Sequence, residues 1–314
     1  MKVVALAGGV GGAKLVHGLS MILPPDDLSV IVNTGDDFEY SGLNISPDLD
    51  TVCYTLANLS NSKTGWGRAD ESWITYHEIA SINGPDWFRL GDKDLATHLV
   101  RTARLKEGQK LSKISKELCE IWGIDHSVFP MSDDPVRTMV HTADGEILGF
   151  QEYFVHQGCM PVVDHFEFRG VESALPMREV SKAIRDCDLV IITPSNPWVS
   201  IDPILAIPGY RDAISQKPVI AVSPLIGGKA IKGPAAKMYQ ELGIAPCASA
   251  VANHYKDFLT GFIFDNQDCH ELEKIEAWRI IAIVTDILMM NNQDRLRLAQ
   301  EVLQFGETIL NRSR

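Results

Sequence analysis

The stretch MKVVALAGGVGGAKLVHGL, residues 1–19, indicates how the chain is built, because a short apolar run leads directly into four glycines and a lysine. Residues 3–7 have the composition of a buried parallel strand, and residues 13–19 can continue as a helix. The glycines then lie on a strand-to-helix turn, where backbone N–H groups and a helix N-terminus point at the same space. Such a turn favours phosphate.

The glycine turn matches neither of the two common phosphate motifs. A Walker-A loop needs Gly-Lys followed by Ser or Thr, but Lys14 follows an alanine and precedes a leucine. The dinucleotide-binding fingerprint needs a third glycine where Lys14 stands. The glycines of the turn are Gly8, Gly9, Gly11 and Gly12. They predict a nucleotide-like phosphate site or, as the alternative, a helix that only packs closely on a sheet.

Composition restricts the class of protein and its partners. The 314 residues have the make-up of an ordinary globular protein, for which one large domain or two is expected. The net charge of -12 argues against nucleic acid or an anionic membrane as the main partner. The first apolar run is too short for a signal peptide, and the run over residues 280–290 is too short to span a bilayer. We therefore expect a cytoplasmic protein.

The cysteines do not form a recognisable ligand pattern. There are six, with no CxxC pair and no Cys/His spacing of the zinc-site type, so we expect buried free thiols. The nine histidines are scattered in the same way. The sequence therefore predicts no metal site made of His or Cys.

Strand and helix patterns alternate along most of the chain. LSVIVN (28–33), DLVIITP (188–194) and KPVIAVSP (217–224) read as further strands, each followed by a helical stretch. This order predicts an α/β fold, with a Rossmann-like, three-layer, doubly wound and mainly parallel sheet in one domain that spans residues 1–314.

The middle and the end of the chain depart from that alternation. Residues 136–155 predict a β-hairpin around Asp144-Gly145, within a smaller inserted β-hairpin and helical lobe at roughly 60–175. Residues 87–90 predict a short strand before a helix. Residues 271–290 and 294–310 predict two helices, of which the second has an apolar side that we interpret as core packing, with a subunit interface as the alternative.

Four unusual loops follow predicted strands: GGVGGAK (8–14), NTGDD (33–37), TPSNP (193–197) and SPLIGGKAIKGP (223–234). In an open parallel sheet, ligands bind in the crevice beyond the carboxyl ends of the strands, so these loops should share one crevice. Glycine amides can approach a diphosphate, lysines can offset its charge, and Ser or Asn can add directional hydrogen bonds. The predicted nucleotide- and phosphate-binding residues are Gly8, Gly9, Gly11, Gly12, Lys14, Ser195, Asn196, Gly227, Gly228, Lys229 and Lys232.

An acidic set complements these cations. Asp36, Asp37, Asp48 and Asp50 crowd beside the predicted phosphate site, where their carboxylates would repel one another without a cation. Mg²⁺ is the natural candidate, and we assign Asp36 and Asp37 as its ligands. Either Ser46 or Asp48 can cap the helix that begins near Pro47. Asp50 can favour the helix dipole or accept a proton from an attacking hydroxyl.

Together these motifs resemble one known family, the 2-phospho-L-lactate transferases of deazaflavin coenzyme F420 biosynthesis. The resemblance extends over nearly the whole chain and rests on ALAGGVGGAKL, VNTGDD, LNISPDLDTVCYTLAN, RLGDKDLATHLVRT, ITPSNPWVSIDPIL and VSPLIGGKAIKGPAAKM. SPDLDT and GDKDLATHLVRT favour the transferase branch over its relatives, the nucleotide-sugar-related binding proteins of the gluconeogenesis-factor type.

The resemblance implies a reaction, its cofactor and two site residues. The guanosine diphosphate ester of lactate, or of enolpyruvate, would give its phosphorylated acid to the terminal ribityl hydroxyl of 7,8-didemethyl-8-hydroxy-5-deazariboflavin, with release of GMP and the help of Mg²⁺. The family's acceptor-binding pair falls on Asp50 of SPDLDT and Arg89 of FRLGD, and Asp50 would be the catalytic residue that orients or deprotonates the hydroxyl.

Two other classes of protein remain as alternatives. One is a nucleotide-sugar-binding regulator with the same fold, and the other is a nicotinamide-dependent oxidoreductase, which the missing third glycine disfavours. The sequence does not distinguish lactate from enolpyruvate in the donor. A homodimer is expected, since this is the usual assembly of soluble symmetric enzymes.

Overall fold

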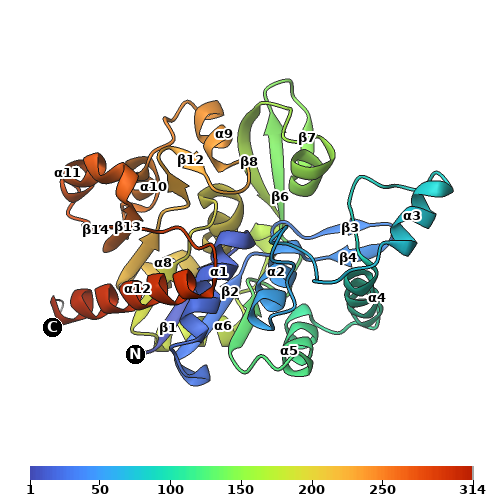
Figure 1. The fold of residues 1–314 in the computed structure, drawn as a ribbon, viewed down its shortest axis with the longest axis horizontal. Helices are drawn as coiled ribbons and strands as arrows, with labels where there is room; N and C mark the ends of the chain where they lie inside the picture. The colour runs from blue at the N-terminus through green and yellow to red at the C-terminus, as the bar shows by residue number, and fades with distance from the viewer. Residues whose placement is uncertain (313–314) are drawn as a thin grey trace.

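The computed structural model describes residues 1–312, and a seven-stranded sheet lies at its centre (Figure 1). All of its neighbouring strands pair in parallel. In spatial order the strands are β14 (Ile281–Thr285), β13 (Gly261–Asp265), β10 (Val219–Val222), β9 (Leu189–Ile192), β1 (Val3–Ala7), β2 (Leu28–Val32) and β5 (Ser127–Pro130). The strands predicted over 28–33, 188–194 and 217–224 are confirmed as β2, β9 and β10.

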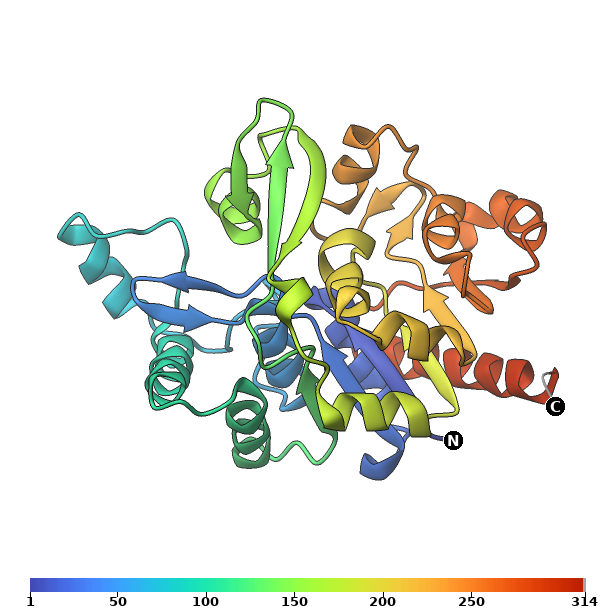
Figure 2. The ribbon, with the colours of Figure 1, turned by 180° about the vertical axis from the view of Figure 1, so that it is seen from behind.

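Helices cover both faces of this sheet, because alternate residues of each buried strand point to opposite sides. In β1, Val3 and Ala5 join the core on one face, and Val4 and Leu6 join the core on the other. The first face packs against α1 (Gly9–Ser20), α2 (Pro47–Leu56), α5 (Leu111–Ile121) and α12 (Asn292–Arg312). The second packs against α6 (Arg178–Asp186), α7 (Asp202–Ala206), α8 (Tyr210–Ser215), α10 (Ala248–Tyr255) and α11 (Leu272–Glu276), seen in part from behind in Figure 2. The predicted three-layer, doubly wound fold is thereby confirmed.

Smaller elements project from the sheet toward its carboxyl edge. A separate antiparallel sheet consists of β7 (Ile147–Gly149), β6 (Arg137–Thr142) and β8 (Val163–Arg169). Two short hairpins are β3 (Phe38–Tyr40) with β4 (Leu43–Ile45), and β11 (Leu225–Ile226) with β12 (Lys229–Ala230). The other helices are α3 (Ile74–Ser81), α4 (Asp92–Lys106), α9 (Ala235–Glu241), the π-helices η2 (Glu152–His156) and η4 (Pro197–Ile201), and the 3-10 helices η1 (Pro25–Asp27), η3 (Val171–Ser173) and η5 (Asn266–Glu271).

The predicted hairpin around Asp144-Gly145 is confirmed as β6 and β7, but its second arm is shorter than expected. After Gly149 the chain turns into η2, and its partner on the other side of β6 is β8. The lobe expected at roughly 60–175 is not one continuous insertion, since β5 within that range pairs with β2 in the main sheet. The short strand predicted at residues 87–90 is wrong, because those residues form loop and bends.

The helix predicted over residues 271–290 is also wrong. Only α11 is helical there, and the run that follows it is β14, the edge strand beside β13. Isoleucine and valine dominate β14, and β-branched residues fit a strand better than a helix. The second predicted helix is confirmed as α12, and the burial of Leu298, Ala299 and Val302 confirms that its apolar side packs on the core.

The thiols are free, as expected, but only half of them are buried. Cys53, Cys119 and Cys187 are buried, two others are partly accessible, and Cys269 is exposed. No helix within residues 1–312 is both long and apolar enough to span a bilayer.

Candidate active site

The site lies where the chain reverses its direction of travel across the sheet. From β1 the chain proceeds to β2 and β5 on one side, then returns to β9 on the other side of β1. The loops that follow β1 and β9 therefore diverge and leave a crevice, as at the topological switch point of other doubly wound folds. A cavity of about 560 Å³ occupies this crevice, and residues from all four predicted loops line it.

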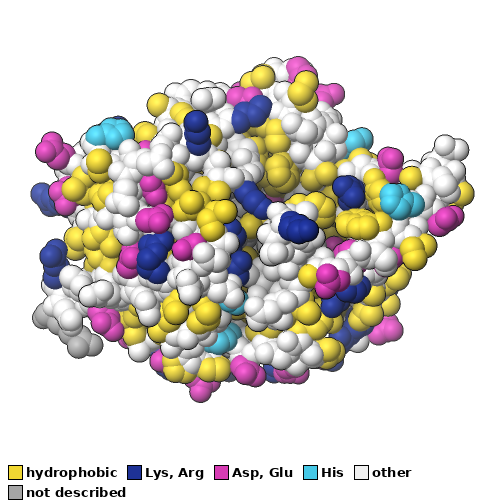
Figure 3. Space-filling model, in the orientation of Figure 1, with side chains coloured by type: hydrophobic (Ala, Val, Ile, Leu, Met, Phe, Trp, Pro, Cys, Tyr) yellow, Lys and Arg dark blue, Asp and Glu magenta, His cyan; other side chains and the backbone are white. Residues whose placement is uncertain are grey.

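Most of the predicted site residues lie on the wall of this cavity, which Figure 3 shows from the front as a hollow with Lys and Arg side chains gathered around it. Those on the wall are Gly8, Gly9, Gly11, Lys14, Asp36, Asp50, Arg89, Ser195, Asn196 and Lys232. Gly12 and Asp37 lie behind it, and neither Gly227 nor Gly228 is on it. Lys229 instead lines a neighbouring cavity of about 480 Å³ beside η5.

The glycine turn packs α1 closely against the sheet, which is one of the two purposes that the sequence left open. A Cβ on Gly11 would lie 2.4 Å from the Pro194 carbonyl oxygen, and one on Gly12 would lie 2.6 Å from Ser195 Oγ, so these glycines allow α1 to pack against the loop after β9. Gly9 has a φ of +64°, which only glycine adopts easily. Ser195 Oγ donates to the Gly8 carbonyl at 2.8 Å, which ties the two diverging loops together.

Asp48 connects the second loop to this turn. Its Oδ1 accepts the Gly9 N–H at 2.7 Å, and its Oδ2 accepts the Asn33 amide at 2.9 Å. The side chain therefore caps α1 rather than its own helix, because the N-terminus of α1 carries unsatisfied N–H groups and partial positive charge. Ser46 occupies the N-cap position of α2, but its hydroxyl donates to Asp37 Oδ2 at 2.7 Å instead of to the helix.

Three buried carboxylates of this region hold their protons unusually strongly. Burial raises the pKa of Asp37 to about 7 and that of Asp48 to about 6. Burial, and then the nearby charge of Asp48, raises the pKa of Asp36 well above its usual value. Asp36 Oδ1 and Asp37 Oδ1 are also buried without a hydrogen-bond partner among the described residues. A hard divalent cation prefers carboxylate oxygens as ligands, and these two oxygens have no other partner among the described residues.

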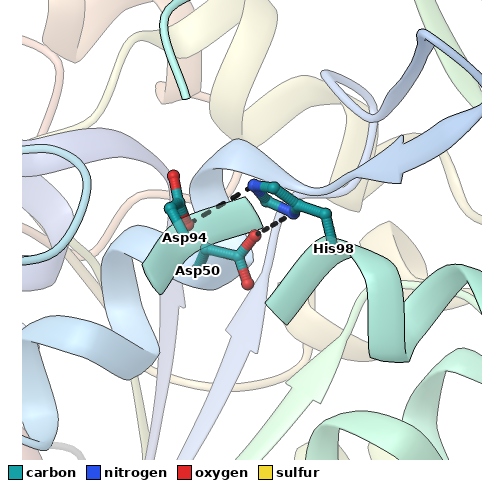
Figure 4. A group of neighbouring side chains, drawn as sticks. All are labelled: Asp50, Asp94 and His98. Carbon is teal, nitrogen blue, oxygen red and sulfur yellow. Dashed lines mark ion pairs between the residues drawn. The ribbon is translucent and has the colours of Figure 1, made fainter. Parts of the chain in front are cut away.

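Asp50 belongs to a different arrangement, a buried network between α2 and α4 (Figure 4). Both of its carboxylate oxygens accept hydrogen bonds from the Arg101 guanidinium. His98 lies between two carboxylates, with Nδ1 3.7 Å from Asp50 Oδ2 and Nε2 3.4 Å from Asp94 Oδ1. Asp94 also accepts the Tyr54 hydroxyl at 2.8 Å. Burial opposes ionisation of Asp94, but the hydrogen bonds from His98 and Tyr54 lower its pKa overall.

The α4 members of this network were not predicted as site residues. Asp94, His98 and Arg101 recur at spacings of four and three residues, which places them on one face of the helix. That face is polar and yet buried, whereas Leu99 and Val100 on the same helix are exposed. The inverted pattern within GDKDLATHLVRT was the available signal.

A cluster of cations lies at the glycine-turn end of the cavity. Lys14 Nζ donates to the Met289 carbonyl at 2.6 Å, and Lys232 Nζ donates to the Thr64 carbonyl at 2.5 Å. Burial, followed by the charges of Arg295 and Lys232, lowers the pKa of Lys14. Arg295, which no motif indicated, therefore adds a third positive charge near this end. Cations crowded at a helix N-terminus favour an anionic ligand such as a diphosphate.

The other end of the cavity is apolar and aromatic. Arg89 lies there, with its guanidinium carbon 4.8 Å from the centre of the Trp73 ring and 5.7 Å from that of Tyr76. Trp87 stacks on His156 of η2, with ring centres 4.9 Å apart, and so connects the loop before α4 to the lobe. The aromatic residues on the cavity wall are Tyr54, Trp66, Trp87, Phe88, Phe150 and Phe154. Such a wall suits a flat, conjugated ligand.

Comparisons with known proteins show which chains this one is similar to. A family model described as 2-phospho-L-lactate transferase CofD matches residues 3–299. A phosphoenolpyruvate transferase from Kitasatospora aureofaciens is 40% identical over 98% of this chain and 99% of its own. A 2-phospho-L-lactate transferase from Methanosarcina acetivorans is 38% identical, also over 98% of this chain and 99% of its own. A solved structure of a UPF0052 family member from Bacillus halodurans shares the fold, with a TM-score of 0.64, 15% identity, and coverage of 96% of this chain and 98% of that one.

The raised pKa values predict how stability depends on pH when divalent cations are removed with EDTA. Above about pH 4 the unfolded chain has released the protons of Asp37 and Asp48, while the folded protein holds that of Asp48 up to about pH 6 and that of Asp37 up to about pH 7. Raising the pH through this interval should therefore lower the free energy of unfolding. Thermal melting of the wild type and of Asp37→Asn at both ends of the interval checks this. The wild type should lose more stability than the variant, and an equal loss in both would contradict the assignment.

Proposed function

The chain belongs to the CofD family of 2-phospho-L-lactate transferases and is itself a transferase, and from that premise we propose which groups it transfers. The donor is the guanosine diphosphate ester of lactate or of enolpyruvate. The acceptor is the terminal ribityl hydroxyl of 7,8-didemethyl-8-hydroxy-5-deazariboflavin. The product is the first phosphodiester precursor of coenzyme F420, and GMP is released.

The proposed step is a substitution at phosphorus. The acceptor oxygen forms a bond to the phosphorus that carries the acid, and the bond from that phosphorus to the bridging oxygen of the diphosphate breaks. The hydroxyl proton leaves, and the bridging oxygen departs with GMP. Such a reaction depends on in-line positioning and charge neutralisation more than on a protein nucleophile.

The observation that supports this proposal is a single cavity with two chemically different ends. The glycine turn, Lys14 and Lys232 suit a diphosphate, and the aromatic wall with Arg89 suits a conjugated ring. Asp50 lies on the wall of the same cavity. It is close enough to Asp37 that the charge of Asp50, in addition to burial, raises the pKa of Asp37. The Asp50 carboxylate is therefore available to an acceptor hydroxyl near the phosphate end.

The acidic cluster fits Mg²⁺. Asp36 and Asp37 would hold the ion, since each has a buried carboxylate oxygen without a partner among the described residues. When bound, Mg²⁺ would offset the negative charge that builds up on the phosphates. The chain's own residues hold the surrounding carboxylates in place: Asp48 accepts the Gly9 N–H at the N-terminus of α1, and Asp37 accepts the Ser46 hydroxyl.

The proposal includes both donors, one for each acid. Relatives named for phosphoenolpyruvate and relatives named for 2-phospho-L-lactate are similar to this chain to nearly the same degree. Family membership supports a transferase over both the nucleotide-sugar-binding regulator and the oxidoreductase. The homodimer and the cytoplasmic location stay predictions.

The direct test is product formation. We expect purified protein with the deazaflavin acceptor, either guanosine diphosphate ester and Mg²⁺ to release GMP and form the phosphodiester, as followed by mass spectrometry. EDTA should abolish the reaction, and added Mg²⁺ should restore it. Reactions without acceptor control for simple hydrolysis of the donor. Absence of product with both donors would contradict the proposed function.

Asp50→Asn should lower kcat by roughly 10²-fold, because an amide neither accepts the hydroxyl proton nor presents two acceptor oxygens. A loss well above 10² indicates a base, and a smaller loss indicates orientation only. Asp133→Asn is the matched control, since Asp133 accepts hydrogen bonds from Ser112 and is not on the cavity wall. An Asp50→Asn enzyme with wild-type kcat would exclude both roles.

Arg89→Ala should raise the acceptor KM about tenfold while kcat changes little, if the guanidinium contributes equally to binding in the ground state and in the transition state. Steady-state kinetics at saturating donor measures both constants. Arg211→Ala is the control, because Arg211 also lies over a ring, 4.9 Å from that of Phe258, but is not on the cavity wall. An unchanged acceptor KM in Arg89→Ala would remove Arg89 from the acceptor site.

A further inference from the structure

Arg101 is the largest fully buried side chain of the described residues and is only 1% exposed. It is not on the cavity wall, but the groups to which its guanidinium bonds are. One terminal nitrogen donates to Asp50 Oδ2 at 2.9 Å and lies 3.2 Å from His98 Nδ1, and the other donates to Asp50 Oδ1. Arg101 thus stands directly behind two residues that face the ligand.

Stability is a weak explanation for this buried charge. A buried ion pair can usually be replaced by apolar side chains of similar size without loss of stability, because desolvation offsets the attraction. Here the guanidinium is not even fully satisfied, since its Nε has no hydrogen-bond partner among residues 1–312. A buried and incompletely paired arginine is better explained by the side chain that it orients, here Asp50, than by a gain in stability.

The two-point contact fixes the plane of the Asp50 carboxylate. A guanidinium presents its donors in a rigid fork, so two parallel hydrogen bonds prevent the carboxylate from rotating. Each oxygen of a carboxylate has a second acceptor site, which remains available for a ligand hydroxyl. The same guanidinium contacts His98, with a terminal nitrogen 3.2 Å from Nδ1, while His98 Nε2 lies 3.4 Å from Asp94 Oδ1.

We propose that Arg101 is a positioning residue for the transfer reaction, and that it acts by holding the Asp50 carboxylate in the orientation that receives the acceptor hydroxyl. The inference rests on the proposed function. It assigns to α4 a share in the reaction, although only Asp94 and His98 of that helix reach the cavity. Loss of the Arg101–Asp50 contact should then lower kcat, because a misoriented hydroxyl raises the free energy of the transition state more than that of the bound substrates.

The experiment is a double-mutant cycle on kcat, with Arg101→Met, Asp50→Asn and the double variant. Arg101→Met should lower kcat roughly 30-fold and leave the donor KM within about threefold. If Arg101 acts through Asp50, adding Arg101→Met to Asp50→Asn should cause little further loss, so the two effects should be strongly non-additive. A purely structural role predicts the same factor in both backgrounds, and that result would overturn the inference.

Arg104→Met is the matched control, because Arg104 lies one turn further along α4 and pairs with Glu117, outside the cavity. It should retain wild-type kcat. If Arg101→Met does not fold, as judged by thermal melting, Arg101→Lys decides instead, since it keeps the charge but not the fork. We expect that variant to lose about tenfold in kcat. Wild-type kcat in both Arg101 variants, with an active wild type, overturns this inference alone, whereas a wild type that forms no product overturns the proposed function and the inference with it.

Discussion

The parallel pairing of β1 with β9 is the constraint on which the site depends. The two strands lie side by side but belong to halves of the chain that proceed in opposite directions, so the segments that leave their carboxyl ends must separate. Close contact between the sheet and α1 is still needed beneath the opening, and the side-chain-free positions Gly11 and Gly12 permit it. The hydrogen bond from Ser195 to the Gly8 carbonyl then joins the loop after β9 to the loop after β1. The same packing that closes the core therefore holds the N-terminus of α1 open to a ligand.

Buried charge is arranged in two separate ways around this opening. Near the glycine turn, Asp36 and Asp37 have unpartnered oxygens, and burial makes their ionisation costly unless a cation joins them. Beside α4, the Asp50 carboxylate already has its cation, because Arg101 is supplied by the chain itself. Carboxylates only two residues apart in α2 thus face different conditions: Asp48 contacts the glycine turn through Gly9, and Asp50 contacts α4 through Arg101. Because each carboxylate has its own hydrogen-bond donors, one short helix can carry both aspartates of SPDLDT despite their mutual repulsion.

The sheet and the crevice were predictable from the sequence because they follow from short-range patterns. Apolar strands such as β1 and β10 are recognisable by composition, and glycines, lysines and aspartates after them mark the carboxyl edge. The errors have physical causes as well. β14 was predicted as a helix because its neighbour β13, which stabilises it at the sheet edge, is identified only in three dimensions. The buried Arg101 and the half-buried Arg295 were missed because charged residues are normally assigned to the surface, and their loss of exposure results from packing between distant segments.

The two ends of the cavity also differ in how much of the fold they require. The glycine-turn end is built from loops that leave the carboxyl ends of β1, β2, β9 and β10. The aromatic end is built from the loop before α4 and from the chain around η2, which contact each other where Trp87 stacks on His156. Under the proposed function, those segments would contact the acceptor, and the loops that leave the central sheet would contact the diphosphate. Arg101 lies on α4, between the two, where it can make the orientation of Asp50 depend on both.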